Sequence, residues 1–199
     1  MYKPDTAILM SIQPKWCELI ANGIKTVEVR KTVPKLNTPF KVYMYCTQTV
    51  INGDIVLAKS EEIRTLFPNK QVVGINKGFA AKADLSIRGK VFGEFVCEKT
   101  TGFYPTTDLK QLNPIHFQMC EKSCVDMREL YAYANGKKLY GLHISDVVVY
   151  EKPLELDCFN NLKECPEGTQ NGNCKGCWDC EIKRAPQSWC YAKEKSDIR

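Results

Sequence analysis

The segment "TAILMSIQPKWCELIANGIKTVEVR", residues 6–30, predicts a strand, a helix and a second strand in close succession. Its first seven residues form a short apolar run that is typical of a buried strand. The run stops before Pro14, and proline is favoured at the first position of a helix. The helix over "PKWCELIAN" then has one apolar face, formed by Trp16, Leu19 and Ile20.

The second strand of this segment, "KTVEVR", begins after Gly23, which is a typical residue just past the end of a helix. Its residues alternate between apolar and polar, so Val27 and Val29 are expected to face the core. The opposite face then carries Thr26, Glu28 and Arg30. Lys25 lies in the turn that precedes the strand.

Lys25, Glu28 and Arg30 place two cations around one carboxylate. Such a group can hold a phosphate, recognise the edge of a base, or place a base near a carbonyl. The alternative is an exposed strand face on which Glu28 and Arg30 merely pair with each other, an arrangement that stabilises proteins little. The spacing of these residues alone leaves both interpretations open.

The remaining elements favour a mainly β fold of the α+β class. Strands are predicted at "FKVYMYC" (40–46), "GKVFGEFVCEKT" (89–100, with a bulge or bend at Gly93) and "LYGLHISDVVVYEK" (139–152, kinked near Ser145). A helix is predicted over 123–137, capped by Ser123. Five strands with few helices, and no repeated strand–helix–strand unit, predict a small mixed β-barrel with flanking helices.

The chain divides into a barrel domain, residues 1–152, and a cysteine-rich tail, residues 153–199. An irregular insertion over 47–89 interrupts the barrel and contains one short helical pattern, "SEEIRTLF". No export signal and no run of about 18 apolar residues is present, so the sequence predicts a cytoplasmic protein without membrane contact. The formal net charge of +5 permits a polyanionic partner. A monomer is favoured, and a protein partner is compatible with the tail.

Six of the eleven cysteines crowd the tail. Three of them follow a C-x-x-C-x-x-C spacing, in which a turn brings thiolates to one metal ion. The tail has almost no apolar periodicity, so structural zinc is the best single account of its order. An iron–sulfur cluster and metal-free thiols or disulfides are the alternatives. The candidate ligands are Cys165, Cys174, Cys177, Cys180 and Cys190.

The order strand "ILMSI", helix "PKWCELIANG" and the pattern G-x-K-x-x-E-x-R at Gly23, Lys25, Glu28 and Arg30 resembles the ASCH domain, a branch of the PUA-like superfamily. The later segments, including "GKVFGEFVC", "YGLHISDVVVYEKPLEL" and "RAPQSWCY", are similar to ASCH proteins of phages and bacterial mobile elements. This resemblance implies a PUA-like β-barrel with a cleft that accepts RNA or a nucleotide. The G-x-K-x-x-E-x-R pattern would lie at the base of that cleft.

The ligand-binding residues expected around such a cleft come from several elements. Aromatic side chains there can stack a base, and Trp16, Tyr43, Tyr45 and Trp189 are candidates, although each is individually more typical of core packing. His143 lies in a predicted strand, where a hydrogen-bonded structural role competes with a role in the site. His116 is interpreted as loop packing. The full set is Ser11, Gln13, Trp16, Lys25, Glu28, Arg30, Tyr45 and His143.

Some ASCH proteins resemble amidohydrolases that deacylate N4-acetylcytidine with a lysine, a threonine three residues later and a distant glutamate. Here Lys25 matches the lysine, Glu28 stands in the place of the threonine, and Glu121 or Glu94 corresponds to the glutamate. A carboxylate beside Lys25 stabilises its charged form and so opposes its action as a base. The sequence therefore favours binding of RNA or a modified nucleoside. An amidohydrolase or ribonuclease using Lys25, Glu28 and Glu121, and a zinc-tailed protein adaptor, are the alternatives.

Overall fold

The computed structural model describes residues 6–48, 87–162 and 180–195 of the chain. Most of the predicted insertion, with its short helical pattern, lies outside these ranges. The strands are β1 (Ala7–Ile12), β2 (Val27–Arg30), β3 (Phe40–Cys46), β4 (Val91–Phe103), β5 (Leu139–Leu154), β6 (Phe159–Asn161) and β7 (Trp189–Glu194). The helices are α1 (Pro14–Ala21), α4 (Pro114–Ser123) and α5 (Met127–Ala134), with short 3-10 turns η1 (Leu109–Gln111) and η2 (Leu156–Cys158).

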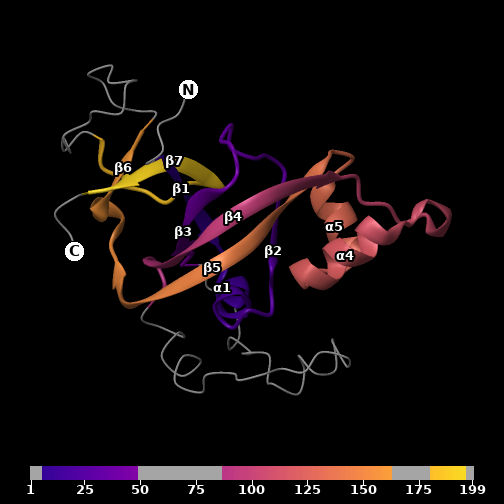
Figure 1. The fold of residues 1–199 in the computed structure, drawn as a ribbon, viewed down its shortest axis with the longest axis horizontal. Coiled ribbons are helices and arrows are strands. Elements are labelled where there is room, and N and C mark those ends of the chain that lie inside the picture. Colours follow the sequence, from indigo (N-terminus) through magenta and orange to yellow (C-terminus); the bar gives the residue numbers. More distant parts are fainter. Residues whose placement is uncertain (1–5, 49–86, 163–179, 196–199) are drawn as a thin grey trace.

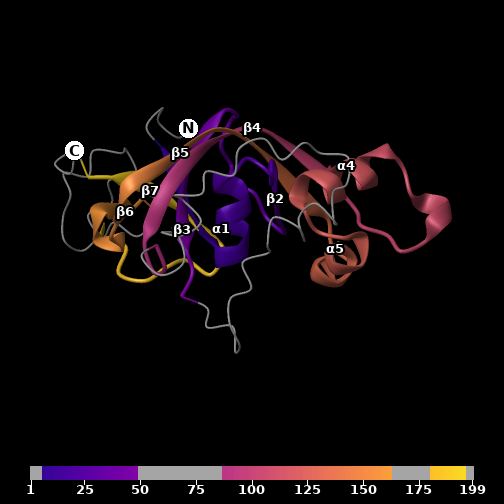
Figure 2. The ribbon, with the colours of Figure 1, turned by 90° about the horizontal axis from the view of Figure 1, so that it is seen from below.

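All seven strands belong to one mixed sheet in the order β2-β5-β4-β3-β1-β7-β6. Only β1 and β3 run parallel; the other neighbours are antiparallel. The sheet arches over α1, and α4 and α5 lie together at one end of the long β4 and β5 strands (Figures 1 and 2). This confirms the α+β, mainly β, PUA-like fold. Within the described residues, however, no pairing between β2 and β6 closes the sheet into a complete barrel.

Helix α1 forms as its sequence predicts. Gln13 is extended just before it, and Pro14 takes the first helical position, where a missing N–H costs nothing. Cys17 and Ile20, three residues apart, are fully buried against β1 and β3 in the main core cluster. The helix ends before Gly23, which adopts a φ of +69° that a residue with a Cβ rarely reaches.

Alternation along the strands separates the hydrophobic core into clusters on either side of the sheet. Val42 and Met44 of β3 pack with α1, whereas Tyr43 and Tyr45 of the same strand pack with Phe159. A third cluster joins β2 to α4 and α5. The residues of "FKVYMYC" thus alternate between the two faces of the sheet, and the predicted strand is confirmed.

Strands β4 and β5 contain the predicted irregularities. The register of their pairing shifts between Val91 and Gly93 and again between Glu94 and Val96. A Cβ at Gly93 would overlap the carbonyl oxygen of Val148, so only glycine fits this close approach of the two backbones. Asp146 has a φ of 46°, which marks the predicted kink in β5.

Helix α4 was not predicted, and its presence corrects two expectations. Asn113 caps α4: its Oδ1 accepts from the amide of Ile115, and its own amide donates to Nδ1 of His116. His116 thus belongs to a helix rather than a loop. Ser123 is the last residue of α4, and α5 is capped instead by Asp126, whose carboxylate accepts from the Glu129 amide. The expected helix was misplaced at its start because both Ser123 and Asp126 are residue types that favour the cap position.

The C-terminal strands extend the same sheet. Strand β7 pairs antiparallel with β1, and β6 pairs with β7. The Trp189 ring lies edge-on to that of Tyr191, with centroids 5.4 Å apart, and the Tyr191 hydroxyl accepts from the Lys35 amide at 2.9 Å. Among the described residues, no helix is both long and apolar enough to cross a membrane.

Candidate functional site

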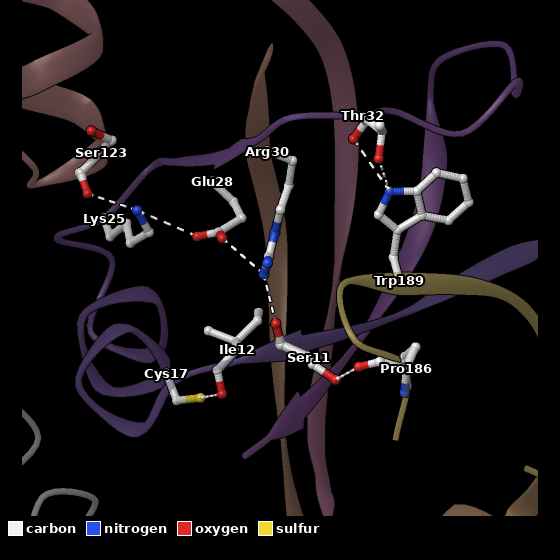
Figure 3. Close-up of polar contacts among 10 residues, drawn as sticks. All are labelled: Ser11, Ile12, Cys17, Lys25, Glu28, Arg30, Thr32, Ser123, Pro186 and Trp189. Carbon is white, nitrogen blue, oxygen red and sulfur yellow. Dashed lines mark hydrogen bonds and ion pairs between the residues drawn. The ribbon is translucent and has the colours of Figure 1, made fainter. Parts of the chain in front are cut away.

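Lys25, Glu28 and Arg30 form one connected ion-pair network (Figure 3). The Lys25 ammonium lies 3.3 Å from Glu28 Oε2, and Arg30 Nη2 lies 3.0 Å from Glu28 Oε1. Lys25 is 2% exposed and Glu28 5% exposed. The interpretation of an exposed strand face is therefore wrong, because water barely reaches the central carboxylate.

Backbone carbonyls from two other elements hold the cations in place. Lys25 Nζ donates to the carbonyl oxygen of Ser123, at the end of α4, at 2.7 Å. Arg30 Nη2 donates to the carbonyl oxygen of Ser11, in β1, at 2.6 Å. The partial negative charges of both carbonyl oxygens stabilise the two cations, whose combined charge exceeds that of the single Glu28 carboxylate. The network therefore links β2 to both β1 and α4.

Two polar atoms of this network are buried and have no hydrogen bond within the described residues. They are Nε of Arg30, a donor, and Oε2 of Glu28, an acceptor that is ion-paired with Lys25. A buried donor and acceptor left in this way cost free energy unless a ligand or water satisfies them. Such atoms are accordingly candidates for ligand contact.

The network borders a cavity of about 230 Å³, which we call the Glu28 cavity. It lies between the end of β1, α1, β2 and α5. Six of the predicted site residues are brought together here; the other lining residues are Val29 of β2 and four residues of α5 and the turn before it. The lining residues are Ser11, Gln13, Trp16, Lys25, Glu28, Val29, Arg30, Val125, Glu129, Leu130 and Tyr133.

Lysine ammonium groups lie over two of the aromatic rings that line the Glu28 cavity. Lys15 Nζ lies 4.0 Å and Lys25 Nζ 4.8 Å from the centroid of the Trp16 ring. Lys31 Nζ lies 4.8 Å from the centroid of Tyr133, which is 41% exposed. The rim of the cavity therefore offers both stacking surfaces and positive charge.

His143 and Tyr45 do not reach the Glu28 cavity. In the ladder between β2 and β5, Glu28 lies opposite Leu142, so His143 shares the other face with Val27. There its Nε2 lies 2.9 Å from the hydroxyl of Thr101, and its pKa is lowered, mainly by burial and then by Lys99 and Lys122. Tyr45 packs in the cluster around Phe159.

The expected distant glutamates also lie away from the Glu28 cavity. Glu121 is on the exposed side of α4. Glu94 accepts from Lys41 at 2.8 Å and from the Tyr150 hydroxyl at 2.5 Å, and burial together with this bond raises the pKa of Tyr150. Neither glutamate lines the cavity. The three-residue catalytic arrangement implied by the amidohydrolases is thus not assembled here.

The contribution of α5 to the cavity was missed from the sequence. Glu129, Leu130 and Tyr133 follow the helix spacing that places residues three and four apart on one face. The sequence "MRELYAYA" contains this spacing, which predicts that Tyr133 lies next to the element against which Leu130 packs. Nothing in the sequence indicated that this partner is β2.

Three of the five candidate metal ligands, Cys165, Cys174 and Cys177, lie outside the described residues. Cys180 is buried, and Cys190 lies opposite Leu9 in the ladder between β1 and β7. Among the described residues, no group of three or more His, Cys, Asp or Glu side chains is positioned to hold a metal ion. Zinc binding by the tail remains a prediction.

Comparison with known proteins identifies a family and a fold. The model of the ASCH domain matches residues 10–165 of the chain. The crystal structure of ASCH from Zymomonas mobilis is similar with a TM-score of 0.53 at 16% identity, covering 95% of this chain and 88% of that one. A mutant of the same protein gives a TM-score of 0.54 at 15% identity, covering 96% and 90%. No curated protein matches the chain. At this identity the structural likeness shows the fold alone.

Proposed function

This chain belongs to the ASCH domain family, and from that premise we propose that the Glu28 cavity binds one unpaired base of an RNA, or a modified nucleoside. The observation that carries the proposal is the buried network of Lys25, Glu28 and Arg30, with one donor and one acceptor left without hydrogen bonds. Unpaired bases in RNA are recognised through the hydrogen-bonding atoms on their edges and by stacking on aromatic rings. The cavity offers groups for both contacts.

The size of the cavity supports a ligand of one base. Pockets for drug-sized molecules usually enclose about 300–1,000 Å³, and the Glu28 cavity encloses about 230 Å³. It therefore suits a single ring system, with the sugar and phosphate outside. Lys15 and Lys31, which lie over Trp16 and Tyr133, place positive charge at the rim, where a phosphate would pass.

The contacts of Lys25 support recognition over hydrolysis. Its ammonium donates to the Ser123 carbonyl and pairs with Glu28, and both contacts use its charged form. Glu28 also lacks the hydroxyl group that the related amidohydrolases carry at this position. The network is consequently suited to orienting a ligand, since each side chain is fixed by two or more partners.

The proposal is tested by binding of a fluorescently labelled single-stranded RNA to the Arg30→Lys variant. Lysine keeps the positive charge beside Glu28 but removes the Nε donor and the planar guanidinium. A hydrogen bond to a charged group contributes about 1.5–3 kcal/mol, so the variant should bind about 10- to 150-fold more weakly. The matched control is Arg128→Lys on α5, because Arg128 is exposed and does not line the cavity.

Three results would contradict this function. RNA binding that neither Arg30→Lys nor Arg128→Lys weakens would mean that only the overall charge attracts RNA, because both variants keep that charge. Release of acetate from N4-acetylcytidine, lost in Lys25→Ala, would show that the site is catalytic. Absence of any retained RNA or nucleoside would leave the protein-adaptor alternative.

A further inference from the structure

A second cavity of about 680 Å³ lies on the other side of α5, and we call it the Tyr131 cavity. Its volume falls within the usual range for ligand pockets, about 300–1,000 Å³. The end of β4, the loop that follows it, η1 and the start of α4 form its walls together with Tyr131 of α5. Its lining residues are Gly102, Phe103, Tyr104, Pro105, Thr106, Thr107, Asp108, Gln111, Asn113, Ile115, His116 and Tyr131.

Helix α5 separates the two cavities. Leu130 and Ala134 form its buried side, and Tyr131 and Tyr133 flank that side in opposite directions because successive helical residues turn by about 100°. Tyr133 lines the Glu28 cavity, and Tyr131 lines the Tyr131 cavity. Both rings are substantially exposed, at 41% and 48% respectively. Figure 2 shows α5 between the β2 side of the molecule and the loop that precedes α4.

The Tyr131 cavity carries the groups that bind an unpaired base. Tyr131 and Tyr104, which is 64% exposed, provide aromatic surfaces. Gln111 uses Nε2 to donate to Asp108, and Asn113 uses Oδ1 to accept from Ile115. Their remaining amide atoms, Gln111 Oε1 and Asn113 Nδ2, make no hydrogen bond within the described ranges. One acceptor and one donor are thus available beside the rings.

Hydrogen bonds within the protein connect the walls that carry these groups. His116 Nε2 lies 2.8 Å from the Tyr104 carbonyl oxygen, and its Nδ1 accepts from the Asn113 amide. The carboxylate of Asp108 accepts hydrogen bonds from the Lys110 backbone amide and from the Gln111 side chain, and these two bonds cap the start of η1. Binding there would require little reordering of the protein, which lowers its entropic cost.

We propose that the Tyr131 cavity is a second base-binding site, which takes a base of the same RNA strand whose other base occupies the Glu28 cavity. The proposal rests on the proposed function of the Glu28 cavity. Nearby cations favour a nucleic acid over a peptide: Lys31 lies over Tyr133, which lines the first cavity, and the end of the Lys138 side chain lies beside Gly102, in the wall of the second. Positive charge beside both cavities thus favours one strand that contacts both sites.

The spacing of the two cavities sets the length of RNA that the proposal requires. A helix with its side chains is about 10–12 Å across, and stacked nucleotides rise about 3.4 Å along one strand. A strand that crosses α5 therefore needs about three to four steps between the two bases. Dinucleotides reach one cavity only, whereas octanucleotides reach both.

The test compares labelled dinucleotides and octanucleotides of uridine, and of adenosine, on the full chain and three variants. Tyr131→Ala should weaken octanucleotide binding about 5- to 150-fold, the loss expected for one stacked base, and leave dinucleotide binding unchanged. Tyr131→Phe keeps the ring and should restore octanucleotide binding. Phe117→Ala is the matched control, since Phe117 is a 63% exposed aromatic residue of α4 that lines neither cavity.

Each other outcome overturns one specific claim. Equal affinity for both lengths, or octanucleotide binding that Tyr131→Ala leaves intact, refutes the second site while the function of the Glu28 cavity stands. Loss of binding in Phe117→Ala equal to that in Tyr131→Ala shows a general effect of exposed rings and also refutes it. Failure of both lengths to bind refutes the proposed function itself. Gln111→Ala on η1 repeats the test without altering α5, so an unfolded Tyr131→Ala variant still leaves a decisive result.

Discussion

Neutralising Glu28 should destabilise the fold far more than neutralising an exposed glutamate. In Glu28→Gln the side chain keeps nearly the same shape, but Lys25 and Arg30 lose the carboxylate that lies 3.3 and 3.0 Å from them. Their side chains are only 2% and 13% exposed, so water replaces little of the lost interaction. Removing one partner of a buried ion pair typically costs about 3–5 kcal/mol.

This cost is large relative to the stability of the whole protein. Domains are usually stable by about 5–15 kcal/mol, and in a chain of this size 1 kcal/mol corresponds to about 2–4 °C in melting temperature. We therefore expect the melting temperature of Glu28→Gln, followed by circular dichroism, to fall by roughly 6–20 °C. Urea unfolding gives the corresponding free energy directly.

Glu155→Gln is the matched control for Glu28→Gln. Glu155 pairs with Lys90 at 2.8 Å, but the two side chains are 59% and 39% exposed, and such pairs contribute about 0–1 kcal/mol. A second comparison is the triple variant with Lys25→Met, Glu28→Gln and Arg30→Met, which should recover stability relative to Glu28→Gln because no unpaired buried charge remains. If Glu28→Gln and Glu155→Gln unfold alike, the argument that Glu28 is the buried centre of the network is wrong.

Two further predictions concern the sheet. The pKa of His143 in the folded protein is lowered from about 6.5, so the unfolded chain binds this proton first as the pH falls, and the free energy of unfolding should decrease below a pH of about 6.5. His143→Asn should remove that part of the decrease, measured by urea unfolding between about pH 5 and 8, and an unchanged dependence of the unfolding free energy on pH would contradict the argument. Gly93→Ala forces a Cβ against the Val148 carbonyl and should lower the free energy of unfolding by about 1–3 kcal/mol. Gly102→Ala is the control, because its Cβ meets the flexible end of the Lys138 side chain and should lower the free energy of unfolding by less; equal losses in urea unfolding would show that the β4 and β5 backbones separate easily.

The local elements were predictable from the sequence because each depends on neighbouring residues. The apolar run of β1, Pro14 before α1 and the alternation in β3 all appear where short-range patterns place them. Helix α4 was missed because its sequence, "PIHFQMCEKS", has little apolar periodicity and derives its stability from Asn113 and Pro114 at its start. A cap formed by asparagine and histidine is difficult to distinguish from a polar loop.

The composition of the site was predictable only in part, since its burial depends on distant segments. The residues of β2 that form the network were identified from their spacing. Their cover comes from α5, about 100 positions later in the chain, and no short-range pattern specifies that contact. His143 and Tyr45 lie away from the Glu28 cavity for a related reason: alternation divides the side chains of a strand between two faces, but only the register of the ladder between β2 and β5 and the packing of β3 determine which face borders the cavity.

Ser11 has a consequence for how the protein is made. Its carbonyl accepts from Arg30, and its hydroxyl donates to the carbonyl of Pro186, 175 positions later in the chain (Figure 3). Its backbone amide donates to the carbonyl of Ser188. A ribosome must therefore translate past residue 189 before β1 gains its second neighbour, β7. Until then one edge of β1, with its apolar residues, is open to pairing with other chains. We expect nascent chains that stall before residue 189 to aggregate or to require a chaperone, and the cavity beside Arg30 to be completed only after synthesis has passed that point.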